Sequence, residues 1–281
     1  MNKSELITKF LEKGILLSPK LLEEADEEKL NSLLPSYETN TLVLAPAQGP
    51  ELSFEIKKTE EKKAFLVKDL VDYHNKKYNT LKTILSAKLN PVSINKLASI
   101  EGKATIIGLV SEKTPAGFLV EDPTGKILVV FNQPLPIASV LGFTGELKNN
   151  SFFTDFVSFP DIPLGKKIKT TTFSISFKTE NTKPKILVNK EKTIENFPTP
   201  TTIKIKKEQE LTVLVFRPEP PFNKNQAIEA LKTRLLPETK IPTENYIIEE
   251  EPDVFWITQK DEWTENYKGV KIISGENAET V

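Results

Sequence analysis

The chain has 281 residues, of which 38% are hydrophobic and 27% are charged, so it can bury more than one core while keeping a heavily charged surface. Cysteine is absent and histidine occurs only once, as His74, which excludes disulfides and cysteine-based zinc sites and nearly excludes histidine chemistry. The formal net charge of -1 excludes the global basic field of a free-standing nucleic-acid binder.

The first predicted element is a small helical module over residues 1–34. Apolar residues follow helical spacing until Gly14 ends the first helix, and Ser18 followed by proline opens a second. Residues 35–63 then mix proline, glycine, threonine and charged residues without apolar periodicity. This composition predicts a linker.

A long amphipathic helix is predicted next, within residues 64–98, and leads into a barrel. Apolar residues recur on one face at spacings of three and four from Val67 to Leu89, and Pro91 marks the end of the helix. His74 lies on this stripe. The position favours a packed or partner-facing aromatic over a metal ligand.

The pattern changes from helix to strand over residues 99–160. A turn of Asp, Pro, Thr and Gly from Asp122 to Gly125 joins two of the strands. Further glycines, in the strand Ala138–Leu147, would permit that strand to bend strongly, as a small closed barrel requires. Several short strands within about 50 residues predict an OB-type β-barrel. The predicted strands are Lys103–Val110, Gly117–Asp122, Lys126–Phe131 and Ala138–Leu147.

Residues 161–281 predict a mixed α/β domain, small for its class. Its expected helix is Gln226–Leu236. The whole chain is therefore expected to be an α+β multidomain protein. The expected strands of this last region are Lys169–Phe177, Lys185–Asn189, Thr201–Lys206, Leu211–Phe216, Asp253–Thr258 and Gly269–Ser274.

The order of several motifs resembles a known family. YNTLKTIL, VSINKL, ATIIGLV, FLVEDPTGKILVVF and PDIP follow one another, and the C-terminal stretch contains DVFWITQKDEW and YKGVKIISG. Over about residues 67–281 this order resembles the small subunit of the archaeal D-family DNA polymerase. The resemblance implies an OB domain followed by a calcineurin-like phosphoesterase domain, which in the family is a manganese-dependent 3'-5' exonuclease.

The sequence departs from that family at its metal-binding motifs. Where the family has Gly-His-x-His, this chain has Thr258, Gln259, Lys260 and Asp261, and where it has Tyr-His-Gly, this chain has Val215, Phe216 and Arg217. Two divalent metals cannot be held there by imidazoles. The resemblance therefore implies a reduced, inactive phosphoesterase domain without catalytic, metal or cofactor residues.

The resemblance implies a non-catalytic accessory or scaffold subunit that binds the large catalytic subunit, supports DNA replication and meets DNA mainly through the complex. A sliding clamp is a further candidate partner. We expect a cytoplasmic protein with no membrane partner, because no apolar stretch approaches the roughly 20 residues of a membrane span. Candidate partner contacts, which are equally candidates for inter-domain core, are Phe152, Phe153, Phe156 and Phe159.

Two alternatives stay open. The first is an OB-fold protein that binds single-stranded nucleic acid through basic and aromatic side chains, although such residues are also common in barrel cores and on barrel surfaces. Its candidate residues are Lys103, Lys113, Phe118, Lys126 and Phe131. The second is a residual 3'-5' exonuclease with metal held by carboxylates alone, namely Asp253, Asp261 and Glu262.

Overall fold

The fold is α+β and mostly β-sheet, as the sequence predicts. The chain forms two compact units, Met1–Leu52 and Ser53–Val281. Among the described helices, none is long and apolar enough to span a membrane. The computed structural model describes residues 3–12, 16–17, 28, 43–44, 52–57, 66–164, 174–180, 183–188, 192–206, 210–237 and 246–280.

The first unit contains one described helix and a short pair of strands. Helix α1 (Lys3–Glu12) buries Leu6 and Phe10, which lie one turn apart, so the first predicted helix is confirmed. Strands β1 (Leu16–Leu17) and β2 (Val43–Leu44) pair in parallel. The second predicted helix falls outside the described residues except for a single position.

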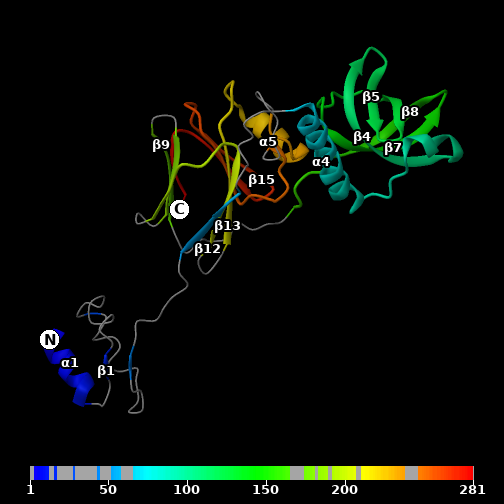
Figure 1. The fold of residues 1–281 in the computed structure, drawn as a ribbon. Helices are drawn as coiled ribbons and strands as arrows, with labels where there is room; N and C mark the ends of the chain where they lie inside the picture. The colour runs from blue at the N-terminus through cyan, green and yellow to red at the C-terminus, as the bar shows by residue number, and fades with distance from the viewer. Residues whose placement is uncertain are drawn as a thin grey trace. The chain divides into compact units, whose positions relative to one another are not determined.

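The second unit contains a barrel of five strands. They close in the order β4-β5-β6-β8-β7, and every neighbouring pair is antiparallel except β6 and β8 (Figure 1). The sequence pattern had identified the first four strands but not the fifth. The strands are β4 (Lys103–Thr114), β5 (Gly117–Asp122), β6 (Gly125–Val130), β7 (Val140–Lys148) and β8 (Ser151–Ser158).

The predicted turn between β5 and β6 is also a contact point for the segment before the barrel. The Asp122 carboxylate accepts hydrogen bonds from the backbone N–H groups of Thr124 and Gly125, which fixes the turn. Its second oxygen accepts from the N–H of Ile94, at 3.0 Å, at the start of the 3-10 helix η2 (Ile94–Ser99). This hydrogen bond therefore links the segment of residues 92–97 before the barrel to the turn between β5 and β6.

Helix α4 (Val67–Ser86) is covered by the barrel only along its second half. Leu81 and Leu85 pack with Ile107 of β4 and Val140 of β7. The predicted apolar stripe is wrong for the first half of the helix, where Val67 is 81% exposed. His74 is exposed too, so it does not belong to a packed face. Periodicity marks an apolar face but cannot say where a neighbour covers it.

A six-stranded mixed sheet follows the barrel in the order β15-β16-β14-β13-β12-β3. Strands β13, β14 and β16 are parallel, and the outer pairs are antiparallel. The strands are β3 (Ser53–Ile56), β12 (Thr201–Lys206), β13 (Glu210–Phe216), β14 (Val254–Ile257), β15 (Trp263–Tyr267) and β16 (Val270–Ser274).

Strand β3 corrects the predicted linker over residues 35–63. Ser53–Ile56 pairs antiparallel with β12 and forms one edge of the sheet. Its side chains are largely exposed, with Phe54 at 40%, although polar and apolar residues alternate over its four positions. A four-residue edge strand among charged residues carries too little pattern to be recognised.

A second sheet covers one face of the six-stranded sheet. Its order is β11-β10-β9-β17, and all its pairs are antiparallel. The ring of Phe177 lies against that of Trp256 in β14, with centroids 4.9 Å apart. Residues 165–173, where the sequence predicts the first part of a strand, lie outside the described residues. The strands are β9 (Ile175–Glu180), β10 (Lys183–Val188), β11 (Lys192–Ile194) and β17 (Asn277–Thr280).

Helix α5 (Lys224–Thr233) covers the opposite face, so the central strands of the six-stranded sheet are buried on both sides (Figure 1). Ala227 and Leu231 of the helix pack with Phe255 and Ile257 of β14. The strand β14 therefore consists of four apolar residues in a row, since neither of its faces meets water. The mixed α/β pattern predicted a helix and several strands, but it did not predict that a helix and a second sheet would cover opposite faces of one sheet.

Candidate functional site

The residues that the resemblance implies to be former metal-ligand positions lie at one edge of the six-stranded sheet. Strands β13, β14 and β16 are parallel, and Phe216, Ile257 and Ser274 lie in one row at their carboxyl ends. Arg217 and Thr258 follow directly. We call this row and the residues that follow it the carboxyl edge; ligand sites of open parallel sheets form outside such edges.

The side chain of Gln259 closes a loop onto the carboxyl edge. Its Oε1 accepts a hydrogen bond from the backbone N–H of Phe222 at 2.7 Å, and its Nε2 donates to the Phe222 carbonyl at 2.8 Å. Gln259 is only 8% exposed. The ring of Phe222 meets Phe216 edge to face, with centroids 5.6 Å apart. The Gln259 side-chain amide thus pairs with the backbone at a position where the resemblance implies a former metal-binding motif.

The other buried polar groups of the carboxyl edge are also satisfied within the chain. The N–H of Thr258 donates to the Phe216 carbonyl at 2.9 Å, and the Ser274 hydroxyl donates to the Asp261 carbonyl. The indole N–H of Trp256 donates to the Gly275 carbonyl at 3.0 Å. In contrast, the side chains of Arg217, Lys260, Asp261 and Glu262 are exposed.

The three carboxylates of the exonuclease alternative do not come together. Asp253 is 7% exposed, precedes β14, and accepts a hydrogen bond from the N–H of Thr212 at 2.8 Å. It lies at the amino edge of the sheet, roughly 13 Å from the carboxyl edge, given the rise of a four-residue strand. Asp261 and Glu262 follow β14 at the other end. Among the described residues, no group of three His, Cys, Asp or Glu could hold a metal ion.

The candidate nucleic-acid residues do not form one patch. Phe118 is 3% exposed and belongs to the barrel core, and Phe131 packs partly buried against the same core. Lys103 pairs with Asp155 at 2.8 Å, and Lys126 pairs with Glu121. Of the five candidates, Lys113 alone is exposed and takes part neither in the core nor in an ion pair that the structure records.

The four candidate phenylalanines divide into core and surface. Phe152 is fully buried in the barrel. Phe159 is half-buried, packs against that core, and carries the Lys232 ammonium 4.0 Å above its ring. Phe153 and Phe156 are 43% and 63% exposed.

The comparisons with known proteins agree with the motif order. No family model matches the chain. The DNA polymerase II small subunit of Archaeoglobus fulgidus is 29% identical to it over 123 residues. The chain is similar to an archaeal DNA polymerase small subunit. The match covers 40% of this chain and spans only 25% of the length of that relative.

The PDIP motif of this small-subunit-like chain ties the barrel to the sheets that follow. The Asp161 carboxylate accepts from the Tyr267 hydroxyl at 3.0 Å and pairs with the Lys268 ammonium at 2.6 Å. Arg234 Nε donates to the Pro160 carbonyl at 2.8 Å. Burial, together with the bonded Asp161 carboxylate, raises the pKa of Tyr267 well above its ordinary value. In the sequence, PDIP is one of the motifs that carry the resemblance, and no local pattern shows that Asp161 makes these contacts.

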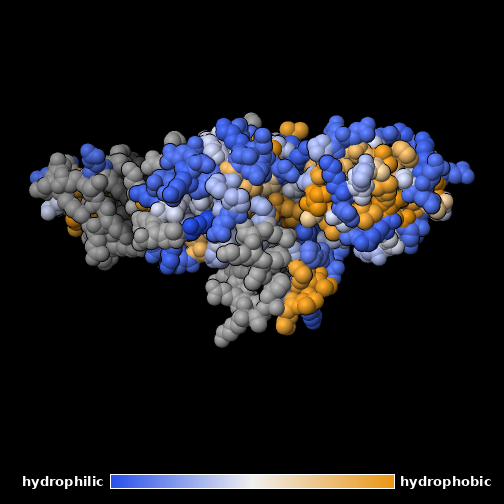
Figure 2. All heavy atoms as spheres, turned by 90° about the horizontal axis from the view of Figure 1, so that it is seen from above, coloured by the Kyte–Doolittle hydropathy of each residue, from blue (hydrophilic) through white to orange (hydrophobic). Residues whose placement is uncertain are grey.

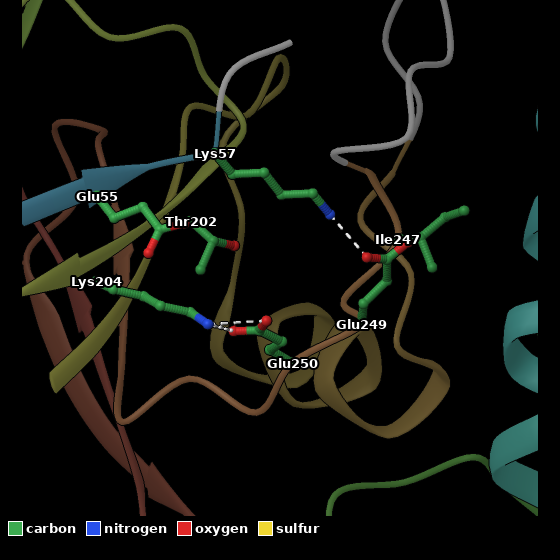
Figure 3. A pocket seen from close by; sticks show the side chains of 7 residues that line it. All are labelled: Glu55, Lys57, Thr202, Lys204, Ile247, Glu249 and Glu250. Carbon is green, nitrogen blue, oxygen red and sulfur yellow. Dashed lines mark hydrogen bonds and ion pairs between the residues drawn. The ribbon is translucent and has the colours of Figure 1, made fainter. Parts of the chain in front are cut away.

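A hollow of about 180 Å³ beside β3 and β12 is lined by paired charges (Figure 3). Lys57 bonds Glu249 at 2.9 Å and Lys204 pairs with Glu250 at 2.7 Å. Burial alone would raise the pKa of Glu249, but hydrogen bonds and charges from Lys57 and Lys76 outweigh it and lower that pKa. Because each of these lysines is paired with a carboxylate, we assign the hollow a structural role.

Proposed function

We propose that this chain is a non-catalytic accessory subunit of a D-family replicative DNA polymerase, which binds the large catalytic subunit and supports DNA replication. The observation that carries the proposal is the carboxyl edge. There, Gln259 bonds the backbone of Phe222 at the position where the resembling family carries metal-binding histidines. Similarity to an archaeal DNA polymerase II small subunit supports the same assignment.

The proposal includes the two finer domain assignments. The five-stranded barrel, with its single parallel pair between β6 and β8, supports an OB-type domain. The mixed sheet, with its parallel centre, a helix on one face and a second sheet on the other, supports a reduced phosphoesterase domain that has kept its scaffold. In such a subunit DNA is contacted mainly through the complex.

The test is co-expression with the large polymerase subunit from the same organism, followed by size-exclusion chromatography. We expect the two chains to co-elute in equal amounts, whereas separate elution would contradict the proposal. The complex and the free chain are then given a 3'-labelled primer with Mn²⁺. Degradation by the free chain that disappears in an Asp261→Ala variant would restore the exonuclease alternative.

Direct binding of single-stranded nucleic acid by the barrel is the second candidate. The observations in its favour are two side chains of the barrel domain. Phe131, directly after β6, is only partly buried, and Lys113 on β4 is exposed. Titration with a labelled oligonucleotide at low and high salt tests it, because contacts with phosphates weaken steeply as salt rises. Binding that is absent at low salt would remove this candidate.

A further inference from the structure

The outer surface of β8 carries two large apolar side chains that the barrel does not need for its core. Phe153 and Phe156 are 43% and 63% exposed, whereas their neighbour Phe152 is fully buried. Figure 2 shows apolar side chains gathered over the barrel within a border of hydrophilic ones. An exposed phenylalanine pair on a barrel strand therefore needs an explanation of its own.

A β-bulge places both side chains on the same surface. In the ladder between β7 and β8, Thr154 lies opposite Gly145 and Phe156 lies opposite Thr144, so Asp155 is the extra residue. With strict alternation, Phe156 would point to the same side as Phe152, into the core. The extra residue reverses that parity, so Phe156 is exposed and Val157 packs against the core instead.

The bulge is fixed by its neighbours. A Cβ atom at Gly145 would lie 2.0 Å from the backbone carbonyl oxygen of Phe153, so only glycine permits this approach of the two strands. The extra residue, Asp155, pairs with Lys103 on β4 at 2.8 Å. The outward direction of Phe156 is thus built into the barrel.

The surroundings of the two rings are apolar at the centre and neutral at the border. Half-buried Val130 lies beside Phe153 across the parallel β6 and β8 pair. The lysines beside these rings are each paired with an acid: Lys103 with Asp155, and Lys148 with Glu146 at 2.7 Å. A surface that stacks single-stranded nucleic acid combines aromatic rings with a net positive groove. An aromatic centre with a neutral polar border is instead typical of protein interfaces.

We propose that the β8 face, defined as Phe153, Phe156 and Val130 with the ion pairs that border them, docks a protein partner through an apolar segment with few charges. This inference rests on the proposed function, in which that partner is the large polymerase subunit. The two phenylalanines are the anchors of the contact, and the paired lysines and acids form its rim. Because the rim is neutral, binding should depend little on salt.

The experiment measures binding of the large subunit to three forms of the full chain: the unchanged chain, the double variant Phe153→Ser with Phe156→Ser, and the control Leu164→Ser. Leu164 is 84% exposed and lies outside the barrel strands. We expect binding by the double variant to weaken at least about tenfold and the control to change less than about twofold. Raising the salt should leave the affinity of the unchanged chain nearly constant.

The outcomes separate the two proposals. If the unchanged chain does not bind the large subunit, both the proposed function and the β8 face fall. If all three forms bind equally, or the control weakens as much as the double variant, only the β8 face falls. If the double variant unfolds, Phe156→Ser alone is measured, and the same criteria apply to it.

Two other occupants would also overturn the inference. Light scattering of the unchanged chain would reveal a dimer, and a dimer that Phe156→Ser dissociates would assign the face to a second copy. An oligonucleotide that binds the unchanged chain in a salt-sensitive way, but not the double variant, would assign the face to nucleic acid.

Discussion

The carboxyl edge of the six-stranded sheet and the β8 face of the barrel differ in where their side chains are directed. At the carboxyl edge, Gln259 and Thr258 turn inward and bond to the chain's own backbone. At the β8 face, Phe153 and Phe156 turn outward with nothing from the described chain covering them fully. A region whose polar groups are all satisfied within the chain serves stability, whereas exposed aromatic anchors retain the capacity to bind.

The largest effect is expected from the strand that leads into the carboxyl edge. Trp256→Ala removes a fully buried ring that packs on Phe177 and donates to the Gly275 carbonyl, so we expect a loss of about 3–5 kcal/mol in the free energy of unfolding. Urea denaturation measures it. The matched control is Trp263→Ala on the edge strand β15, where the ring is only half-buried and the loss should be smaller. Equal losses would show that the two-sheet contact does not stabilise this region.

Gln259→Ala tests whether the carboxyl edge is structural. The change leaves the N–H and the carbonyl of Phe222 without the partners they now have, so we expect a loss of about 2 kcal/mol in unfolding free energy. Lys260→Ala is the control at the next position, where the exposed side chain should change stability by less than about 0.5 kcal/mol. If the two variants unfold at the same urea concentration, the amide does not hold the loop.

The β8 face should show the opposite behaviour. Phe156→Ala is expected to change the free energy of unfolding by no more than about 0.5 kcal/mol, because the ring is already 63% exposed. Phe152→Ala, four positions earlier on the same strand, should cost about 3–5 kcal/mol, because its ring is fully buried. A large loss of stability in Phe156→Ala would mean that this ring supports the barrel and would weaken its role as an anchor.

The smallest effect concerns the ion pair at the border of the β8 face. The hydrogen bond from Lys103, followed by its charge, lowers the pKa of the Asp155 carboxyl. A lowered pKa means that the pair contributes fully above the ordinary pKa of aspartate and is lost as pH falls through the lowered value. Titration of the carboxyl carbon by NMR should place its midpoint below the ordinary value, and Lys103→Ala should raise it. An unchanged midpoint in that variant would show that the pair does not persist in solution.

Local elements were predictable wherever their signals lie close together in the sequence. The turn from Asp122 to Gly125 and the strands on either side follow from turn chemistry and alternation, and β12 matches its predicted bounds. Strand β3 was missed because its alternation of polar and apolar residues is only four residues long and lies among charged residues. Strand β15 was missed as well, since three polar residues in a row separate its aromatic ends and leave no apolar alternation.

The candidate site was predictable as a set of positions but not as a set of contacts. The resemblance implies that Phe216 and Gln259 are former ligand positions, and the parallel strands bring them to one edge. The partner of Gln259 is Phe222, which lies 37 residues earlier in the chain, and no local pattern links the two. The four candidate phenylalanines could not be divided into core and surface either, because no local pattern shows which of them distant residues cover.

The sequence by itself determined which side-chain chemistry the chain possesses, where most strands and helices lie, and that histidine occurs only once, as His74. The tertiary structure alone decided which groups are covered. One extra residue at Asp155 reverses the direction of Phe156, and the buried face of α4 begins only at Tyr73, although apolar residues recur from Val67 onward. Both outcomes depend on residues distant in the sequence, because burial is a property of the neighbours that the fold supplies.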